Sequence, residues 1–229
     1  MFDDLRKKVL EANLLLPKYG LITFTWGNVS AIDRQEGVIA IKPSGVEYDD
    51  MTYDDIVIVN MEGEMVWGEL KPSSDTMTHI VLYKHFPKIS AVVHTHSTWA
   101  TIMSQIGKPL LPFGTTHADY FADAIPCTRD MNAAEIENNY EEETGNVIIE
   151  TFKGIEPMNI PAVLVKNHGP FTWGESPKKA VENAVVLEEV AKMAYFTQQA
   201  QAEAAVMPKE LINKHFYRKH GENAYYGQK

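Results

Sequence analysis

The chain lacks three features, each of which would have pointed to a broad class of protein. Among its 229 residues Cys127 is the single cysteine, so neither an intrachain disulfide nor a cysteine-based metal cluster is possible. No apolar run approaches the roughly 18 residues that a membrane-spanning helix needs. Basic residues are also few: 21 Lys and Arg against 31 Asp and Glu give a formal charge of −10, which disfavours a nucleic-acid partner.

Further absences narrow the choice of fold and location. The first residues lack the apolar stretch of a secretory signal peptide, so we expect a cytoplasmic protein. The sequence has no G-x-G-x-x-G dinucleotide fingerprint and no phosphate loop of the G-x-x-x-x-G-K-[ST] type. No internal repeat or low-complexity segment divides the chain. We therefore expect residues 1–229 to form a single domain with a full hydrophobic core.

The hydrophobic pattern predicts the order of helices and strands. Helices are expected at 2–16, 76–85, 98–106, 133–140 and 177–202, with one more after Pro208. Strands are expected at 21–25, 29–32, 38–42, 56–60, 65–67 and 89–96, before His168 and within 169–174, whereas 144–152 is compatible with either element. Because the two kinds of element do not alternate regularly, we predict a single α/β domain with a central, mostly antiparallel sheet flanked by helices.

Three histidines at the ends of apolar, strand-like runs are the strongest functional signal. His94 and His96 close the run Ile89-Ser-Ala-Val-Val-His-Thr-His, and His168 follows Ala162-Val-Leu-Val-Lys-Asn. Residues two apart in a strand share one face, so the first two imidazoles can bind one metal ion. A strand histidine can also be a hydrogen-bonded core residue, but a third histidine after a second such run favours the metal. Histidine and carboxylate ligands suit Zn²⁺ first and Mn²⁺ or another divalent ion second.

Three short polar segments are candidate anion-binding sites: Lys42-Pro-Ser-Gly, Lys71-Pro-Ser-Ser-Asp and Thr25-Trp-Gly-Asn-Val-Ser. Serine hydroxyls and free backbone N–H groups in such turns can bind a phosphate, and the second turn also precedes a helix, whose first N–H groups carry partial positive charge. Ordinary turn and cap chemistry explains each segment when it is taken alone. Asp75 is equally open to two interpretations, because it can favour the start of its helix electrostatically or add a carboxylate ligand to the metal.

Taken in order along essentially the whole chain, these segments resemble the class II aldolase and adducin family, most closely its L-ribulose-5-phosphate 4-epimerase branch. The segments that carry the resemblance are Thr25-Trp-Gly-Asn-Val-Ser, Ile41-Lys-Pro-Ser-Gly-Val, Lys71-Pro-Ser-Ser-Asp-Thr, Val93-His-Thr-His-Ser, Gly114-Thr-Thr-His-Ala-Asp-Tyr, Glu143-Thr-Gly-Asn-Val, Asn167-His-Gly-Pro-Phe and the tail over 214–228. The histidines are common to the wider family, whereas the segment from Gly114 and the tail are specific to the epimerase branch.

The resemblance implies that this chain holds one divalent ion per subunit, Zn²⁺ or another such as Mn²⁺. Its ligands would be Asp75, His94, His96 and His168. In the sugar-phosphate aldolases of the family a glutamate stands at the Asp75 position as acid/base, and a shorter aspartate fits an enzyme that has moved this task elsewhere. Asp119 and Tyr226 would then be the acid/base residues. The contacts to substrate and phosphate would come from Gly27, Asn28, Lys42, Ser44, Gly45, Ser73, Ser74, Thr115, Glu141, His215 and Arg218.

The family forms cyclic homotetramers whose active sites lie between subunits. The resemblance therefore implies that Asp119, His215, Arg218 and Tyr226 reach a neighbour's metal site, and that the tail over 208–229 contacts a neighbouring subunit. Without the resemblance, Asp119 fits a turn-capping residue, Tyr226 a packing residue, and the basic cluster around Arg218 a solvated helix face.

The implied reaction interconverts L-ribulose 5-phosphate and D-xylulose 5-phosphate by inverting C4, in pentose catabolism of the L-arabinose type. The hydrogen on C4 is not acidic because the carbonyl is at C2, so direct deprotonation is a poor route. Cleavage of the C3–C4 bond instead leaves an enediolate, which a divalent metal stabilises as a Lewis acid. C4 is inverted if the aldehyde of the other fragment, glycolaldehyde phosphate, rotates before the bond re-forms.

Two other functions compete with the epimerase. One is a sugar-phosphate aldolase that releases its two fragments, and the other is a non-catalytic scaffolding domain, as in cytoskeletal relatives that share the fold. A scaffold should lack a complete histidine triad and phosphate-binding turns, and this chain has both. The expected partners are therefore a small-molecule sugar phosphate and further copies of the chain, with no nucleic acid and no membrane.

Overall fold

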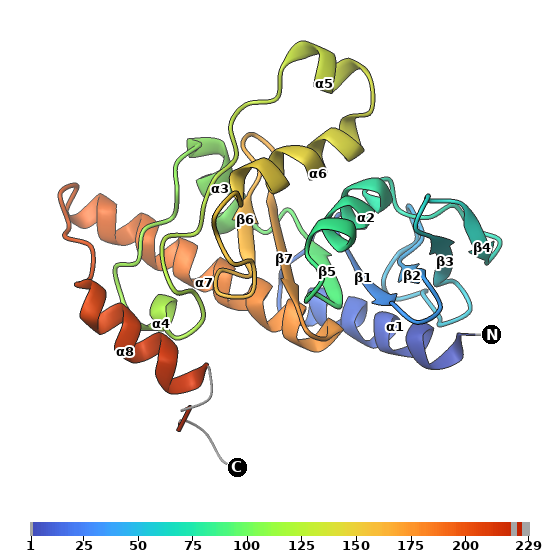
Figure 1. The fold of residues 1–229 in the computed structure, drawn as a ribbon, viewed down its shortest axis with the longest axis horizontal. Coiled ribbons are helices and arrows are strands. Elements are labelled where there is room, and N and C mark those ends of the chain that lie inside the picture. The colour runs from blue at the N-terminus through green and yellow to red at the C-terminus, as the bar shows by residue number, and fades with distance from the viewer. Residues whose placement is uncertain (1, 221–223, 226–229) are drawn as a thin grey trace.

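The computed structural model describes residues 2–220, 224 and 225 and is built around one sheet (Figure 1). Its strands are β1 (Asn28–Asp33), β2 (Val38–Ile41), β3 (Val57–Asn60), β4 (Met65–Trp67), β5 (Ala91–His94), β6 (Ala162–Leu164) and β7 (Pro170–Gly174). The seven strands lie in the order β4-β3-β2-β1-β5-β7-β6, and each neighbouring pair is antiparallel. The predicted α/β domain with a central antiparallel sheet flanked by helices is thus confirmed.

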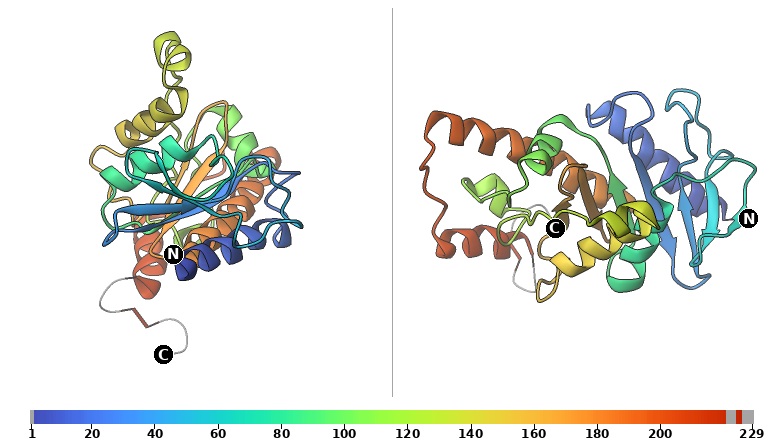
Figure 2. Two further views of the ribbon diagram at one scale, coloured as in Figure 1. Left: turned by 90° about the vertical axis from the view of Figure 1, so that its right-hand side faces the viewer. Right: turned by 90° about the horizontal axis from the view of Figure 1, so that it is seen from above.

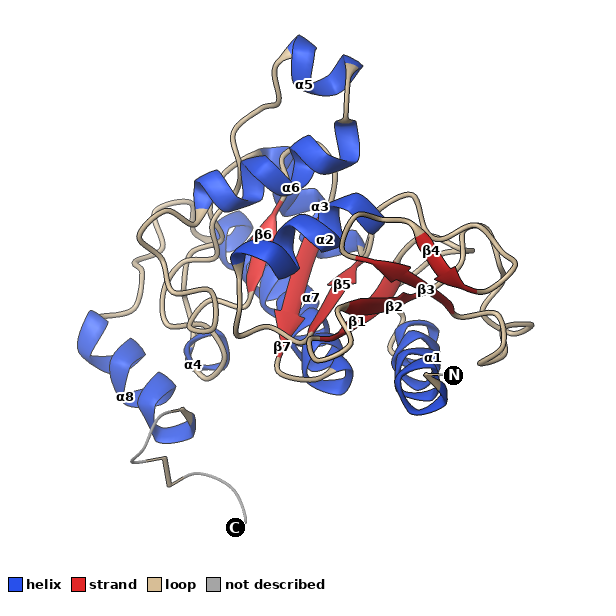
Figure 3. Ribbon diagram, turned by 45° about the vertical axis from the view of Figure 1, so that its right-hand side comes forward, coloured by secondary structure: helices blue, strands red, loops and turns tan. Residues whose placement is uncertain are grey.

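Helices cover both faces of the sheet. They are α1 (Asp3–Lys18), α2 (Thr76–His85), α3 (Thr98–Ile106), α4 (Thr115–Ala118), α5 (Ala133–Glu137), α6 (Tyr140–Thr151), α7 (Pro177–Ala200) and α8 (Lys209–Lys219). Helices α1 and α7 lie on one face and α2 and α6 on the other (Figure 3). Figure 2 shows α5 projecting away from the rest of the molecule. Within the described ranges, no helix is both long enough and apolar enough to cross a membrane.

Strand alternation divides the core into two layers. In β1, Val29 and Ala31 face the α1 side, and Ile32 faces the α2 side; in β5, Val93 faces the α1 side and Val92 the α2 side. All five side chains are buried, which is the expected pattern for strands that have a helix layer on each face. Burial on both faces leaves the ends of these strands as the places where polar side chains can gather.

The long helix α7 shows how the sequence specifies its own boundaries. Ser176 caps its start, accepting a hydrogen bond from the Lys179 backbone N–H at 3.2 Å, and Pro177 occupies the first turn, where no N–H donor is needed. The residues of its buried face recur at helical spacing: Ala180, Val181, Ala184, Leu187, Val190, Ala191 and Ala194. The helix begins at the predicted residue and ends two residues before the predicted end.

Several predicted elements differ from the structure. The predicted strand 21–25 does not form, because Phe24 adopts left-handed backbone angles (φ +51°) in a turn. Segment 144–152, whose sequence is compatible with either element, is helical up to Thr151, in a helix that begins earlier, at Tyr140. The first helix, predicted at 2–16, continues through Pro17 to Lys18. Strand β5 also stops at His94, so His96 lies just beyond it.

Candidate metal centre and its cavity

The three histidines meet where two neighbouring strands and a tight connection come together. His94 is the last residue of β5 and pairs with Phe171 of β7, while His96 follows two residues later. His168 lies in the connection between β6 and β7, two residues before β7 begins. Because β5 and β7 are adjacent in the sheet, residues more than 70 positions apart in the sequence become neighbours.

The histidine geometry fits a metal ion. One ring nitrogen from each of His94, His96 and His168 lies within 4.8 Å of the other two, and the Nε2 atoms of His94 and His96 are 3.1 Å apart. A tetrahedral zinc ion with Zn–N bonds of about 2.0–2.1 Å separates its ligand nitrogens by about 3.3 Å. The group can therefore bind a divalent cation with little movement of the side chains.

The surroundings of His94 orient its ring toward the other two histidines, and burial of His96 and His168 favours the neutral form that a metal requires. His94 Nδ1 donates to the Pro170 carbonyl oxygen at 3.0 Å, which leaves Nε2 free to face the other histidines, and its ring stacks on Phe171 with centroids 4.2 Å apart. Burial lowers the pKa of His168 to about 4 and also lowers the pKa of His96. At neutral pH the rings of His96 and His168 are therefore uncharged and able to donate a lone pair.

Asp75 stands beside the histidines at the start of α2. Its side chain makes no capping hydrogen bond to the helix; instead Oδ2 accepts from Asn28 Nδ2 at 2.7 Å. Burial opposes its ionisation most strongly, yet nearby histidines and the Asn28 amide hold the pKa of the carboxyl below its usual value. Asp75 is not one of the three residues whose ligand atoms converge, so it lies next to the candidate metal position as an ionised carboxylate.

A cavity of about 580 Å³ opens over these residues and collects most of the predicted site. It is lined by Thr25, Trp26, Gly27, Asn28, Lys42, Pro43, Ser44, Gly45, Ser73, Ser74, Asp75, His94, His96, Tyr140, Glu141 and His168. The structure thus brings together all four predicted metal ligands and the predicted contacts at Gly27, Asn28, Lys42, Ser44, Gly45, Ser73, Ser74 and Glu141. Polar groups converging in a concave site of this size suit a small polar ligand.

The two Lys-Pro-Ser turns pair with each other on one wall of this cavity. The Ser44 N–H donates to the Lys71 carbonyl at 2.9 Å, and the Ser73 N–H donates to the Lys42 carbonyl at 3.1 Å. The buried Lys42 ammonium donates to the Val46 carbonyl at 2.7 Å, so it supports the first turn from below. Burial lowers the pKa of Lys42 to about 8, against the influence of nearby Glu47. The two Lys-Pro-Ser turns, which are similar in sequence, are therefore also hydrogen-bonded to each other through their backbones.

Gly27 shows why a glycine stands in the third polar segment. Its φ is +112°, and a Cβ atom built on it would lie 2.8 Å from the His94 carbonyl oxygen. The Gly27 carbonyl in turn accepts from the Tyr48 hydroxyl at 2.8 Å. Glycine allows this segment to pass directly over the end of β5, which places the Asn28 amide beside Asp75.

The remaining predicted residues gather elsewhere on the chain, between α4 and α8. Asp119 accepts from His215 Nδ1 at 3.0 Å, from Arg218 Nε at 3.0 Å and from Arg218 Nη2 at 2.8 Å. Burial opposes ionisation of Asp119, but Arg218, His215 and nearby Lys219 together hold its pKa below the usual value. Neither this cluster nor Thr115, at the start of α4, lines the cavity. Tyr226 lies outside the described residues.

Comparison with known proteins agrees with this geometry. Residues 7–195 match the Class II Aldolase and Adducin N-terminal domain. The chain belongs to this family.

Solved structures of the class II aldolase family share the fold over nearly the whole chain. An L-fuculose 1-phosphate aldolase superimposes with a TM-score of 0.79 at 24% identity, covering 93% of this chain and 94% of its own. YgbL from Klebsiella pneumoniae, described as a candidate aldolase/epimerase/decarboxylase, gives 0.72 at 25% identity, with 92% and 97% covered. A sugar-phosphate aldolase from Thermotoga maritima gives 0.67 at 19% identity, with 90% and 98% covered.

Several residues of this site were not predicted, among them Trp26, Tyr140 and His79. Trp26 and Tyr140 line the cavity, and the Tyr140 hydroxyl lies 3.4 Å from His168 Nδ1. Trp26 directly precedes Gly27, and Tyr140 directly precedes Glu141. Their positions next to predicted site residues could therefore have indicated that they line the cavity. His79 is fully buried beneath the site, where burial lowers its pKa to about 3; a single histidine on an apolar helix gives no such signal.

Proposed function

We propose that this chain is a metal-dependent epimerase that interconverts L-ribulose 5-phosphate and D-xylulose 5-phosphate at C4. The observation that carries the proposal is the convergence of three imidazoles and two paired serine turns in one cavity, with Asp75 beside them. By the resemblance, this shorter carboxylate stands where the aldolases have a glutamate. The carboxylate of Asp75 is already bound to Asn28, which favours a supporting role over proton transfer to substrate. Cytoplasmic pentose catabolism of the L-arabinose type is the proposed context.

His94, His96 and His168 would hold the ion, Zn²⁺ or another divalent cation such as Mn²⁺, one per subunit. When bound, such an ion acts as a Lewis acid toward the negative charge that develops beside the C2 carbonyl as the C3–C4 bond breaks. Three protein ligands leave coordination positions open for substrate oxygens. Asp75, which lies next to the histidines, would offset the positive charge and orient the neighbouring Asn28 amide.

The paired turns would hold the phosphate. Ser44 and Ser73 lie on the two turns that hydrogen-bond to each other, and Ser74 leads into α2, whose first N–H groups are suited to an anion. The Asn28 amide, which donates to Ser73 Oγ at 3.0 Å, keeps that hydroxyl facing the cavity. A phosphate held here would retain glycolaldehyde phosphate while its carbonyl rotates, so that the two fragments recombine instead of separating.

The proton carriers would come from another copy of the chain. Cleavage removes the proton from the C4 hydroxyl as the C3–C4 bond breaks, and bond formation on the opposite carbonyl face returns a proton to that oxygen. Asp119 and Tyr226 would serve the two faces, by acid–base catalysis worth roughly 10²–10⁴-fold. Because the Asp119 cluster does not line the cavity of its own chain, we propose a homotetramer in which the region around α8 and the tail 208–229 completes a neighbour's site.

A sugar-phosphate aldolase is the second candidate. The similarity to L-fuculose 1-phosphate aldolase over 93% of this chain favours it. The two functions share bond cleavage and differ in whether the fragments leave.

Incubation of the purified protein with L-ribulose 5-phosphate separates the two candidates. The epimerase should accumulate D-xylulose 5-phosphate to equilibrium with no stoichiometric free glycolaldehyde phosphate, both followed by ¹³C NMR. Protein stripped with a chelator should be inactive until a divalent ion is restored. Stoichiometric glycolaldehyde phosphate without xylulose 5-phosphate would replace the epimerase by the aldolase.

A further inference from the structure

The connection that presents His168 is a tight turn with an unusual backbone. Within the turn over 165–169, the His168 N–H donates to the Val165 carbonyl at 3.0 Å, and the Val165 N–H donates to the Gly169 carbonyl at 3.0 Å. Asn167, directly before the candidate ligand, has a left-handed backbone (φ +61°), which asparagine tolerates better than most residues. The direction of the His168 side chain therefore depends on how firmly the two preceding residues are held.

A single carboxylate contacts both of those residues. Asp130 Oδ2 accepts from Lys166 Nζ at 2.5 Å, and Asp130 Oδ1 accepts from Asn167 Nδ2 at 3.1 Å. The same stretch of chain also holds the turn by its backbone, because Thr128 Oγ1 accepts from the Lys166 N–H at 3.0 Å. Asp130 thus connects the outer side of the turn to a segment that is remote from it in sequence.

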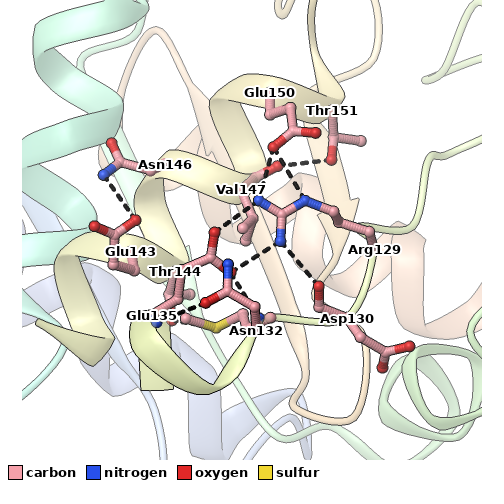
Figure 4. Close-up of polar contacts among 11 residues, drawn as sticks. Arg129, Asp130, Asn132, Glu135, Glu143, Thr144, Asn146, Val147, Glu150 and Thr151 are labelled. Atoms are coloured by element: carbon pink, nitrogen blue, oxygen red, sulfur yellow. Dashed lines mark hydrogen bonds and ion pairs between the residues drawn. The ribbon is translucent and has the colours of Figure 1, made fainter. Parts of the chain in front are cut away.

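The segment that carries Asp130 is itself anchored on both sides. Residues 126–128 extend along β6, since the Leu164 N–H donates to the Pro126 carbonyl at 2.9 Å and the Thr128 N–H donates to the Leu164 carbonyl at 2.9 Å. On the other side, Arg129 forms ion pairs of 2.8 Å with Glu135 of α5 and 2.9 Å with Glu150 of α6, as Figure 4 shows. The backbone around Asp130 is therefore held in place, and Asp130 can in turn hold the two residues that precede His168.

We propose that Asp130 is a positioning residue for the metal ligand His168. It contacts neither the imidazole nor the cavity, and it acts by fixing the two residues before the ligand, so that the ring arrives at the position where His94 and His96 converge. The inference rests on the proposed metal site. An exposed ion pair contributes little to global stability, typically 0–1 kcal/mol, so the expected effect of Asp130 is on the geometry of the site and not on the fold.

The test measures divalent-ion affinity of the metal-free protein, without any assay of turnover. Chelator competition with Zn²⁺ should show Asp130→Ala binding about tenfold or more weakly than wild type, which is the usual effect of losing a residue that orients a ligand. The Co²⁺ absorption bands of Asp130→Ala should also shift or weaken. Asp130→Asn keeps an acceptor for Asn167 but loses the charge that holds Lys166. Its Zn²⁺ affinity should therefore lie between those of wild type and Asp130→Ala.

Asp4→Ala is the matched control, because it removes a carboxylate from an exposed ion pair with Lys8 in α1, which takes no part in holding the turn or its anchor. Its Zn²⁺ affinity and Co²⁺ spectrum should equal those of wild type. Equal affinity in wild type and Asp130→Ala would overturn the proposal, as would a lower melting temperature of metal-free Asp130→Ala with unchanged affinity. If Asp130→Ala does not fold, unchanged affinity in Asp130→Asn has the same consequence. If wild type itself binds no divalent ion, the proposed function fails together with this inference.

Discussion

The cavity around the histidines and the cluster around Asp119 differ in how they are completed. In the cavity, ligand nitrogens from β5 and from the β6–β7 connection point at a common position and are held there by backbone contacts such as that of His94 to Pro170. In the cluster, Asp119 is satisfied by side chains of α8, chiefly Arg218 and His215, and it does not line the cavity.

The difference indicates that the two parts of the chain have different roles, one in binding the metal and the other in proton transfer. The capacity to bind a metal is complete within a single copy, because all three imidazoles come from one sheet and its connections. The proposed proton carrier Asp119 is preorganised by its contacts with α8, but at a different place. Each subunit of the proposed tetramer would therefore supply a metal site to itself and an acid/base group to its neighbour.

The largest expected effect comes from removing a ligand of the cavity. His94→Ala should weaken Zn²⁺ binding by more than about 100-fold, since even residues that only orient ligands contribute 10–100-fold, and it should abolish turnover. Metal content after gel filtration and an epimerase assay measure both. His85→Ala changes an exposed histidine of α2 and should leave both unchanged. Full metal content in His94→Ala would show that the convergent nitrogens are not the metal site.

Next in size is the loss of the Asp119 carboxylate. Asp119→Asn should lower kcat by roughly 10²–10⁴-fold, the range for one general acid–base group, and leave Zn²⁺ affinity unchanged. Steady-state kinetics and chelator competition measure the two effects. Asp123→Asn, which alters a nearby carboxylate paired with Lys209, should retain wild-type kcat.

The Asp119→Asn variant also tests the division between subunits. Co-refolding it with His94→Ala should restore part of the activity, because a mixed oligomer can place an intact Asp119 beside an intact histidine site. Mixed oligomers that form and remain inactive would contradict the proposal that the two regions act across subunits.

A smaller effect is expected at Asp75, which borders the histidines. Asp75→Glu extends the carboxylate by one methylene in a buried position that is matched to the Asn28 amide, so it should disturb metal geometry and lower turnover by about tenfold. Co²⁺ absorption spectra and kcat report the two effects separately. Unchanged spectra together with unchanged kcat would remove Asp75 from the site.

The last effect is on stability at acidic pH and not on turnover, and it concerns the region next to Asp119. Burial lowers the pKa of His117 in α4 to about 4, whereas an unfolded histidine titrates near 6.5. Between these values the unfolded chain binds the proton and the folded chain does not. Stability of the metal-free protein should therefore fall as the pH drops from about 6.5 toward 4, and should show no such effect above that range.

Urea unfolding at pH 7.5 and pH 5 measures this loss. His117→Gln keeps a donor for the Asp123 carbonyl and removes the titration, so it should reduce the difference in stability between these two pH values by at most about 2 kcal/mol. Part of the dependence should remain, because buried His79 and His168 also have lowered pKa values. His85→Gln serves as the exposed control, and equal pH dependence in His117→Gln and wild type would contradict the assignment.

Most helices and strands were predictable because their signals are local. The helix at 76–85 and the helix at 98–106 have the predicted bounds, since polar or capping residues and Pro87 or Gly107 stand directly beside them. The strand predicted at 21–25 failed because an apolar run resembles a strand whether or not a partner is available. In the structure the chain turns at Phe24 and then, at Gly27, comes close to the His94 carbonyl, which is a tertiary contact that the local sequence does not reveal.

By itself, the sequence determined the kinds of donor available: three imidazoles after strand-like runs, two serine turns and one carboxylate before a helix. Only the tertiary structure decided which of them meet. The antiparallel pairing of β5 with β7 brings His94 and His168 together, and the pairing of the two Lys-Pro-Ser turns places both serines on one wall. Asp119, by contrast, does not line that cavity. The physical reason is that composition and spacing specify local chemistry, whereas strand order and register, which arise from burial along the whole chain, specify distance.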